Sequence, residues 1–195
     1  MKKLLFLSLI VLSFAIVGCG SKTADTNVAN ANACLAGAPD WVLAGGAEGG
    51  LSAVGAAAIG KAGVNFARTE ALANGRDEIA RVLGVKVNNM FKQFTQTTGV
   101  GDDQTVDKVS ANVSKQVASQ MISGSKQAGS WVSPCNELYI LVAVDATLAQ
   151  QAIKEQSLSS LRNEQALWQQ FQAKKAQEEL DNAIKAEFKD SQVQQ

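Results

Sequence analysis

The sequence predicts an α+β fold in which a small antiparallel sheet of about three strands packs against two helices, followed by a long C-terminal helix. Three observations support this class. The run LYILVAV, residues 138–144, is the strongest strand pattern in the chain. The segments 65–97 and 106–121 repeat their apolar residues at intervals of three and four, which is typical of helices that bury one face. The residues after 146 are rich in Gln, Lys and Glu, with scattered apolar positions.

The first nineteen residues carry the features of an export signal. Lys2 and Lys3 form a positive end, no charge follows over residues 4–17, and a glycine precedes Cys19. An uncharged run of this length falls short of the roughly 20 apolar residues of a membrane span. The segment IVGC resembles the lipobox of bacterial lipoproteins, in which the cysteine receives lipid and becomes the first residue after cleavage. The resemblance implies a signal peptide over residues 1–18 and a palmitate-bearing anchor on Cys19. An ordinary cleaved signal with an unmodified cysteine is the alternative.

After the signal, the chain consists of small and polar residues. Residues 20–38 contain Gly, Ser, Thr, Ala, Asn and Asp with hardly any large apolar side chain. Such a segment cannot bury enough surface to fold. We therefore expect a flexible tether over residues 19–38, and packing is expected to begin at PDWV, residues 39–42.

Composition argues against several classes of function. The 195 residues include 18 Lys and Arg and 18 Asp and Glu, and the loss of Lys2 and Lys3 with the signal leaves 16 basic residues against 18 acidic ones. No nucleic-acid partner is expected, because a binder of polyanions needs a basic excess on one face. The sequence has no histidine, which removes the commonest general base and the commonest transition-metal ligand. We therefore expect no catalytic residue, no metal site and no cofactor.

The remaining cysteines favour a disulfide. Once Cys19 is assigned to lipid, Cys34 and Cys135 form an even pair in an exported protein. A bridge between them would close a loop of about 100 residues, worth up to roughly 4.7 kcal/mol in the chain-entropy model. Two free thiols in a reducing setting are the alternative.

The first strand and the first helix follow a glycine-rich turn. Residues 51–59 form a short apolar run bounded by glycines, which favours a buried strand, and their small side chains indicate that a helix lies close upon it. Residues 55–62 have the glycine and lysine spacing of a phosphate-binding loop, but an alanine stands where that loop needs Ser or Thr, so no nucleotide is expected. The helical pattern that starts at Asn65 is expected to continue to about Thr97.

A second helix is predicted after a turn at residues 99–103. Asp102 and Asp103 can cap it, and it is expected to end near Gly124. Its apolar residues repeat at three and four, which overrides the strand preference of valine; they are Val106, Val109, Val113, Val117 and Met121. The aspartates lack the glycine and glutamate of an EF-hand loop, so capping rather than calcium binding is expected.

A hairpin follows the second helix. Residues 126–132 and 137–145 predict two strands around a turn, and the second strand is expected at the centre of the sheet. Cys135 lies in the turn, so a bridge to Cys34 would bring the end of the tether against that edge of the sheet.

One long helix is predicted over the C-terminal region, residues 146–195, and it is expected to run to about Lys189. A helix of some 40 residues spans about 60 Å, which is longer than a small domain can cover. Its distal half is therefore expected to dock on a protein partner, to pair with a second copy through residues 146–189, or to fray.

Several segments together resemble the LPP20 family of bacterial lipoproteins. They are the lipid cysteine, the polar tether, PDWV, the small-residue strand, ALANGRDEIARVLGVKV, QVASQMISGSKQAGSWVS and LYILVAVD, in this order. The resemblance covers residues 39–145 and implies a compact α+β domain with a small antiparallel sheet packed against helices. It also implies a place at the bacterial outer membrane, on the periplasmic face or the cell surface. It implies no chemistry.

The expected function is that of a non-enzymatic, lipid-anchored envelope lipoprotein with a structural or docking role, in contact with the membrane through Cys19. The alternative is a periplasmic binding module for a small ligand, peptide or cell-wall fragment. Its pocket would lie between the sheet and the helix that starts at Asn65, where alanine and glycine leave room. An enzyme would need a base from Asp, Glu or Lys, and no such residue stands out.

Overall fold

The computed structural model describes residues 33–47 and 51–189, so the predicted signal peptide and Cys19 lie outside the described residues. The α+β class is confirmed. The elements are, in order, α2 (Asp40–Ala44), β1 (Leu51–Ala58), α3 (Val64–Thr98), α4 (Asp103–Gly124), β2 (Lys126–Val132), β3 (Glu137–Val144), α5 (Ala146–Asn163), α6 (Gln165–Ala173) and α7 (Gln177–Glu187).

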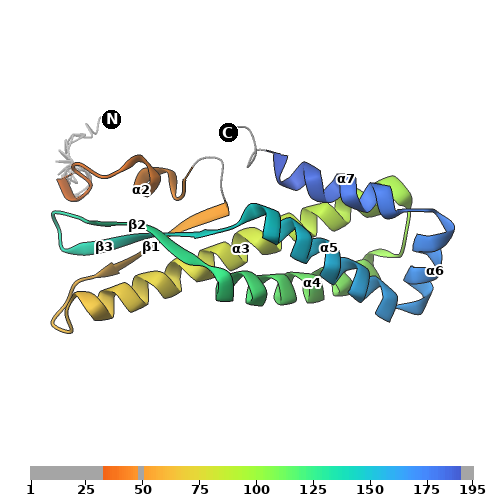
Figure 1. The fold of residues 1–195 in the computed structure, drawn as a ribbon, viewed down its shortest axis with the longest axis horizontal. Helices are drawn as coiled ribbons and strands as arrows, with labels where there is room; N and C mark the ends of the chain where they lie inside the picture. Colours follow the sequence, from red (N-terminus) through yellow and green to blue (C-terminus); the bar gives the residue numbers. More distant parts are fainter. Residues whose placement is uncertain (1–32, 48–50, 190–195) are drawn as a thin grey trace, which may run out of the picture.

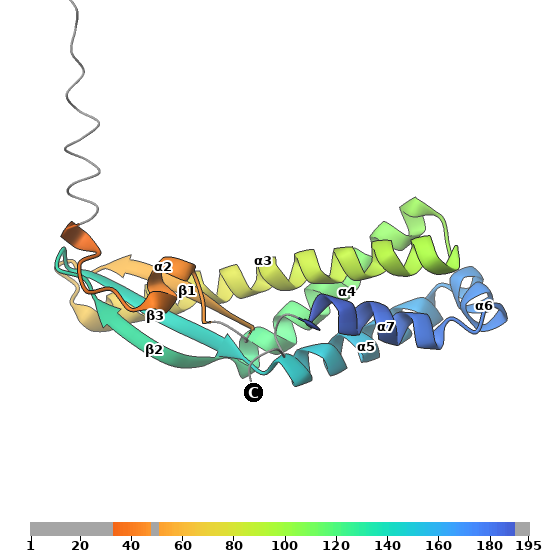
Figure 2. The same cartoon turned by 90° about the horizontal axis from the view of Figure 1, so that it is seen from above.

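The molecule is elongated, with the sheet at one end and helices extending beyond it (Figure 1). Helix α3 runs under the sheet and continues past it, and its 35 residues correspond to about 52 Å. Beyond the sheet, α4 and α7 lie alongside α3, α5 packs on α4 and α7, and α6 forms the far tip (Figure 2). We call residues 33–79 and 122–145 the sheet end, and residues 80–121 and 146–189 the bundle end.

The three strands form an antiparallel sheet in the order β1-β3-β2, so β3 is central, as predicted. Burial alternates along the strands, because successive side chains point to opposite faces. Leu138, Ile140 and Val142 of β3 are buried on the face that α3 covers. The edge strand β2 contains a register shift between Gln127 and Gly129 and is largely exposed.

Small residues bring α3 directly onto the backbone of β1. A Cβ atom added at Gly55 would lie 2.0 Å from the carbonyl oxygen of Ala71, and one added at Gly75 would lie 2.6 Å from a methyl group of Val142. The expected close approach of a helix to the small-residue strand is confirmed. The second helix is also confirmed, and the side chain of Asp102 accepts a hydrogen bond of 3.0 Å from the backbone N–H of Thr105 at its start.

The C-terminal region is helical, but it forms three helices instead of the single long helix predicted. The chain bends at Glu164 and reverses between Lys174 and Ala176, where Lys175 has a φ of 50°. Helix α7 therefore packs on α3 and α5. The apolar residues of the region are buried within the chain, among them Leu161, Leu167, Phe171, Leu180, Ile184 and Phe188.

This reversal corrects the expectation for the distal half of the helix. Within the described residues, the apolar face that was expected to need a partner or a second copy is covered by α3, α4 and α5. The Phe171 ring lies 6.0 Å from the Phe94 ring and 5.3 Å from the Trp168 ring, measured between centroids. An ion pair of 2.8 Å between Lys154 and Asp181 joins α5 to α7. The apolar residues of the bundle end join those of the sheet end in one continuous core.

Candidate functional site

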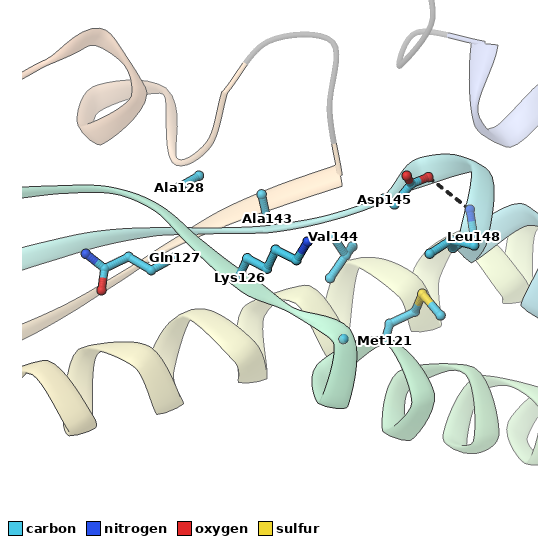
Figure 3. A pocket seen from close by; sticks show the side chains of 9 residues that line it. Met121, Lys126, Gln127, Ala128, Ala143, Val144, Asp145 and Leu148 are labelled. Atoms are coloured by element: carbon cyan, nitrogen blue, oxygen red, sulfur yellow. Dashed lines mark hydrogen bonds between the residues drawn. The ribbon is translucent and has the colours of Figure 1, made fainter.

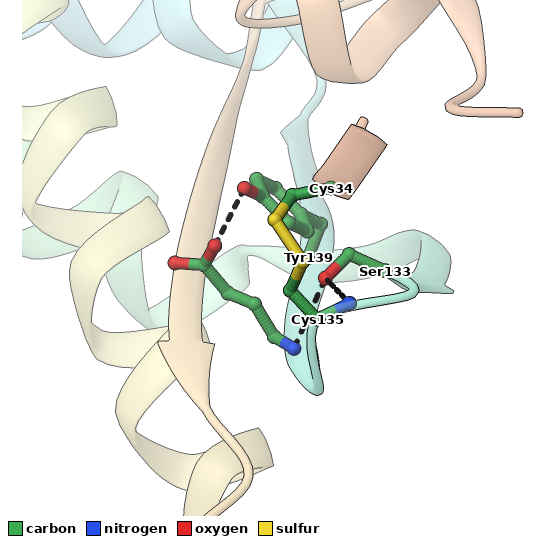
Figure 4. Close-up of a disulfide and its surroundings, with 5 residues drawn as sticks. Cys34, Ser133, Cys135 and Tyr139 are labelled. Atoms are coloured by element: carbon green, nitrogen blue, oxygen red, sulfur yellow. Dashed lines mark hydrogen bonds between the residues drawn. A yellow bond between two sulfur atoms is a disulfide. The ribbon is translucent and has the colours of Figure 1, made fainter. Parts of the chain in front are cut away.

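A disulfide joins Cys34 to Cys135 in the turn between β2 and β3, with a Cα–Cα distance of 5.1 Å (Figure 4). The hydroxyl of Ser133 accepts hydrogen bonds from the backbone N–H groups of Cys135, at 3.2 Å, and of Glu137, at 3.1 Å. These bonds fix the turn that presents the sulfur. The start of the described chain is therefore held at the hairpin, which is the end of the sheet farthest from the bundle (Figure 1).

Residues 33–47, which we call the strap, cross the outer face of the sheet, the face opposite α3 (Figure 2). None of the five residues of α2, all of them described, is buried. One apolar contact is made by Trp41, whose ring lies 3.5 Å from the position of a Cβ added at Gly129. The strap therefore depends on the disulfide more than on packing.

Beneath the strap, the outer face of the sheet carries an aromatic pair. The rings of Trp131 and Tyr139 lie 5.4 Å apart, and the Tyr139 hydroxyl donates a hydrogen bond of 2.7 Å to Glu137. Burial raises the pKa of Tyr139 from 10.0 to about 12, and the hydrogen bond and the charge of Glu137 add to this rise. Tyr139 is thus a neutral donor at physiological pH.

The seam between the sheet and α3 does not hold the predicted ligand pocket. Gly55, Ala71 and Gly75 were expected to leave room there, but the backbone atoms of β1 and α3 occupy that room themselves. Ala67 and Ala71 have no exposed surface. The small side chains serve close packing of the helix on the strand, and this location for a binding site is wrong.

A pocket of about 430 Å³ lies elsewhere, where the end of α4, the start of β2 and the start of α5 meet (Figure 3). Met121, Ala143, Val144 and Leu148 make its walls mostly apolar. Asp145 at its rim is engaged as the cap of α5, with hydrogen bonds from Thr147 at 2.8 Å and Leu148 at 3.1 Å. Lys126 stands at the opposite rim and makes no ion pair with the residues the structure describes. The sequence did not reveal this pocket, because its walls come from four elements, α4, β2, β3 and α5.

The aspartates that the sequence singled out, Asp102 and Asp103, lie at the start of α4. Asp102 caps α4, and the backbone N–H of Thr105, followed by the Thr105 hydroxyl, holds its pKa below the ordinary value of 3.8. Asp103 lies in the first turn of the same helix, and Asp107 lies one turn further on. Over residues 33–47 and 51–189, no cluster of Cys, Asp and Glu has the arrangement of a metal site.

Within the described part of the chain, no helix combines the length and the apolar character needed to cross a bilayer.

Comparison with known families gives one match. A family model described as LPP20 lipoprotein matches residues 39–145, which is more than half of the chain. The matched region contains the strap from Pro39 onward, the whole sheet, α3 and α4. No curated protein and no solved structure matches the chain.

Proposed function

This chain belongs to the LPP20 lipoprotein family, and on that premise we propose that it is a non-enzymatic lipoprotein of the bacterial outer membrane with a docking role. Membership makes it an envelope protein that lipid anchors to a membrane. We assign the anchor to Cys19, the cysteine of the IVGC segment. Multiple acyl chains, at about 0.8 kcal/mol per buried methylene, hold a protein at a bilayer almost permanently.

One observation supports the docking role most directly. The attachment point and the helical bundle lie at opposite ends of a long molecule. Cys34 is fixed to the hairpin turn, and α3 extends about 52 Å from there toward the tip at α6. An anchored chain of this shape can present its bundle to envelope components away from the anchor.

The outer surface of the bundle is suited to polar contact. The exposed face of α4, together with Gln156 of α5, forms a shallow hollow of about 630 Å³, lined by Lys115, Gln116, Ser119, Gln120, Ser123 and Gln156. Side chains of this kind offer many donors and acceptors with little apolar surface, as at the polar rims of protein interfaces. We assign the docking surface to this hollow.

Site-specific photo-crosslinking in intact envelopes tests this assignment. A crosslinking residue at Gln116 should give a discrete adduct with one envelope protein, and the adduct should disappear when Cys19→Ala prevents anchoring. The matched control carries the crosslinker at Glu70, an exposed position of the sheet end. Mass spectrometry of the mature chain should show acyl groups at its N-terminus. The absence of a discrete adduct at Gln116, or equal adducts at both positions, would refute the docking role.

The pocket of Figure 3 supports a second candidate function, a periplasmic module that binds a small ligand, peptide or cell-wall fragment. Its volume of about 430 Å³ lies within the roughly 300–1,000 Å³ of ligand sites, and its few polar groups stand at the rim. Binding to the folded state would raise the melting temperature. A panel of soluble cell-wall fragments should therefore raise it for the native chain and leave it unchanged for Ala143→Trp, which fills the pocket. A panel without any effect on the native chain would reject this candidate.

A further inference from the structure

We propose that the hairpin end of the sheet rests on the lipid bilayer, so that the bundle end points away from the membrane. The contact surface consists of the loop at residues 59–63, the first turn of α3 and the turn at residues 132–136. This inference rests on the lipid anchor proposed above and adds to it an orientation and a protein surface that contacts lipid.

Exposed apolar side chains gather at this end. Val64 is 45% exposed, Phe66 60% and Val132 48%. They are three of the six large apolar side chains that are exposed in the described part of the chain; the others are Leu43 on the strap, and Val85 and Leu148. Phenylalanine and valine at a surface have no partner in water but gain free energy when they enter the interface of a bilayer.

Topology brings these side chains together. Ala58 at the end of β1 pairs with Glu137, and the backbone N–H of Ile59 donates to the carbonyl of Asn136 at 2.7 Å. The loop after β1 and the hairpin turn are therefore neighbours. Side chains in a helix tilt toward its N-terminus, so Val64 and Phe66 in the first turn of α3 lean toward this end of the molecule.

Hydrogen-bond donors lie beside the apolar patch. Lys61 is exposed in the loop and makes no ion pair with the residues the structure describes. Helix α3 begins here without a side-chain cap, so its free N–H groups add partial positive charge. Glu137 also lies at this end, where its carboxylate accepts the hydrogen bond of Tyr139 and offsets the charge of Lys61. Lys61 and the helix amides can therefore donate to lipid phosphates, while the apolar side chains supply the main attraction to the bilayer.

The length of the tether favours the hairpin end as the part that lies next to the bilayer. Cys34 is bound to the hairpin turn, and 14 residues separate it from Cys19. Even fully extended, 14 residues span at most about 50 Å, and a relaxed chain spans less. The hairpin end is thus the part of the molecule nearest to the anchor. The bundle, which lies farther out along α3, is then held at a distance from the lipid (Figure 2).

Tryptophan fluorescence in vesicles tests this orientation. The native tryptophans 41, 131 and 168 are replaced by phenylalanine, and a single probe is introduced by Phe66→Trp or, as the matched control, by Val85→Trp, which is 59% exposed at the bundle end. Circular dichroism checks that both variants fold. The lipidated full chain is reconstituted into phosphatidylethanolamine and phosphatidylglycerol vesicles whose acyl chains carry bromine. We expect several-fold stronger quenching, and bluer emission, for Phe66→Trp than for Val85→Trp.

A second variant keeps the test independent of the tryptophan replacements. Val64→Ser combined with Val132→Ser in the otherwise native lipidated chain should thin the protein layer measured by neutron reflectometry on a supported bilayer, because the molecule tilts. Leu148→Ser, the control at the bundle end, should leave the thickness unchanged. Equal quenching at positions 66 and 85, or a thickness that does not respond, overturns the orientation while the anchor stands. An unmodified Cys19 in mass spectrometry overturns the anchor and this inference with it.

Discussion

The sheet end and the bundle end are packed by opposite means. At the sheet end, Gly55, Ala71 and Gly75 let two backbones touch, and a disulfide holds the strap in place. At the bundle end, large rings such as Phe94 and Phe171 fill the space between helices. The comparison teaches that the seam between β1 and α3 has no space for an added atom, whereas the bundle end loses stability when atoms are removed.

Reduction of the disulfide is expected to have the largest effect. Cys34→Ser combined with Cys135→Ser should lower the free energy of unfolding by up to about 4.7 kcal/mol, the chain-entropy value for a loop of about 100 residues. Urea titration measures the loss, and the native chain in excess reductant should match the variant. Because the strap is hardly buried, its amides should exchange fastest in the variant, while amides of α5 and α7 keep their protection. Uniform loss of protection would contradict the division into two ends.

The next largest loss of stability is expected from deletion of a buried ring at the bundle end. Deletion of an exposed ring at the sheet end should cost little. Phe171→Ala should cost about 4 kcal/mol, because it removes a buried ring that touches Phe94 and Trp168. Phe66→Ala, the same change at a side chain that is 60% exposed, should stay within about 0.5 kcal/mol of the native value. Thermal and urea unfolding of the two variants give the comparison, and similar losses would show that Phe66 is packed in solution.

Addition of one carbon atom at Gly55, in the sheet end, should lower the free energy of unfolding. Gly55→Ala should cost about 3 kcal/mol, because the new Cβ would lie 2.0 Å from the Ala71 carbonyl and force α3 away from β1. Gly84→Ala changes the same residue type in α3, where nothing lies within 4 Å, and should stabilise the chain by about 1 kcal/mol through helix propensity. Opposite signs in urea unfolding are the expected result, and equal signs would refute the close approach.

A smaller effect is expected at the turn between α6 and α7. The Lys174 ammonium donates hydrogen bonds to the carbonyls of Thr98, at 2.7 Å, and Gly99, at 2.8 Å, at the C-terminal end of α3. Lys174→Met should therefore cost about 1 kcal/mol, the scale of an exposed charge at a helix C-terminus. Lys175→Met, one residue further, removes a charge without these bonds and should change the free energy of unfolding little. A loss of equal size in both variants would show that the hydrogen bonds of Lys174 to the end of α3 do not stabilise the fold.

The last effect is absent at neutral pH and appears only at alkaline pH. The pKa of Tyr139 is about 12 in the fold against an ordinary value of 10.0, so between these values the native chain keeps a proton that the unfolded chain loses. The free energy of unfolding should therefore fall as pH rises from about 10 to about 12. Tyr139→Phe should flatten this part of the curve relative to the native chain, since the two chains differ only in this group. Parallel curves would exclude Tyr139 as the cause.

The sequence predicted the sheet end well, because its signals are local. Glycines bound β1, strand formers fill β3, and an even pair of cysteines identified the disulfide. It failed to locate a site there because small residues have two uses, room for a ligand or close packing, and no local pattern separates them. At Gly55 and Gly75 the second use applies.

The bundle end was predicted less well, because no local sequence signal indicates the reversal of the chain between α6 and α7. Neither glycine nor proline occurs between Lys174 and Ala176, and Lys175 adopts a positive φ that other residues rarely take. The contacts that hold the turn are distant in sequence: Lys174 binds the end of α3, and Gln170 accepts a hydrogen bond of 2.8 Å from Gly101. The end of α6 is therefore set by contacts with residues distant in sequence, and not by the spacing of apolar residues along the helix.

Both outer strands of the sheet resist lateral growth. On β1, the side-chain amide of Asn74 donates a hydrogen bond of 2.9 Å to the carbonyl of Ala56, and on β2 the irregularity near Ala128 disturbs the spacing that another strand would need. Molecules confined to the plane of a membrane meet their neighbours far more often than molecules free in solution. An occupied carbonyl on one outer strand and a register shift on the other both work against pairing of the sheet with that of a neighbouring copy.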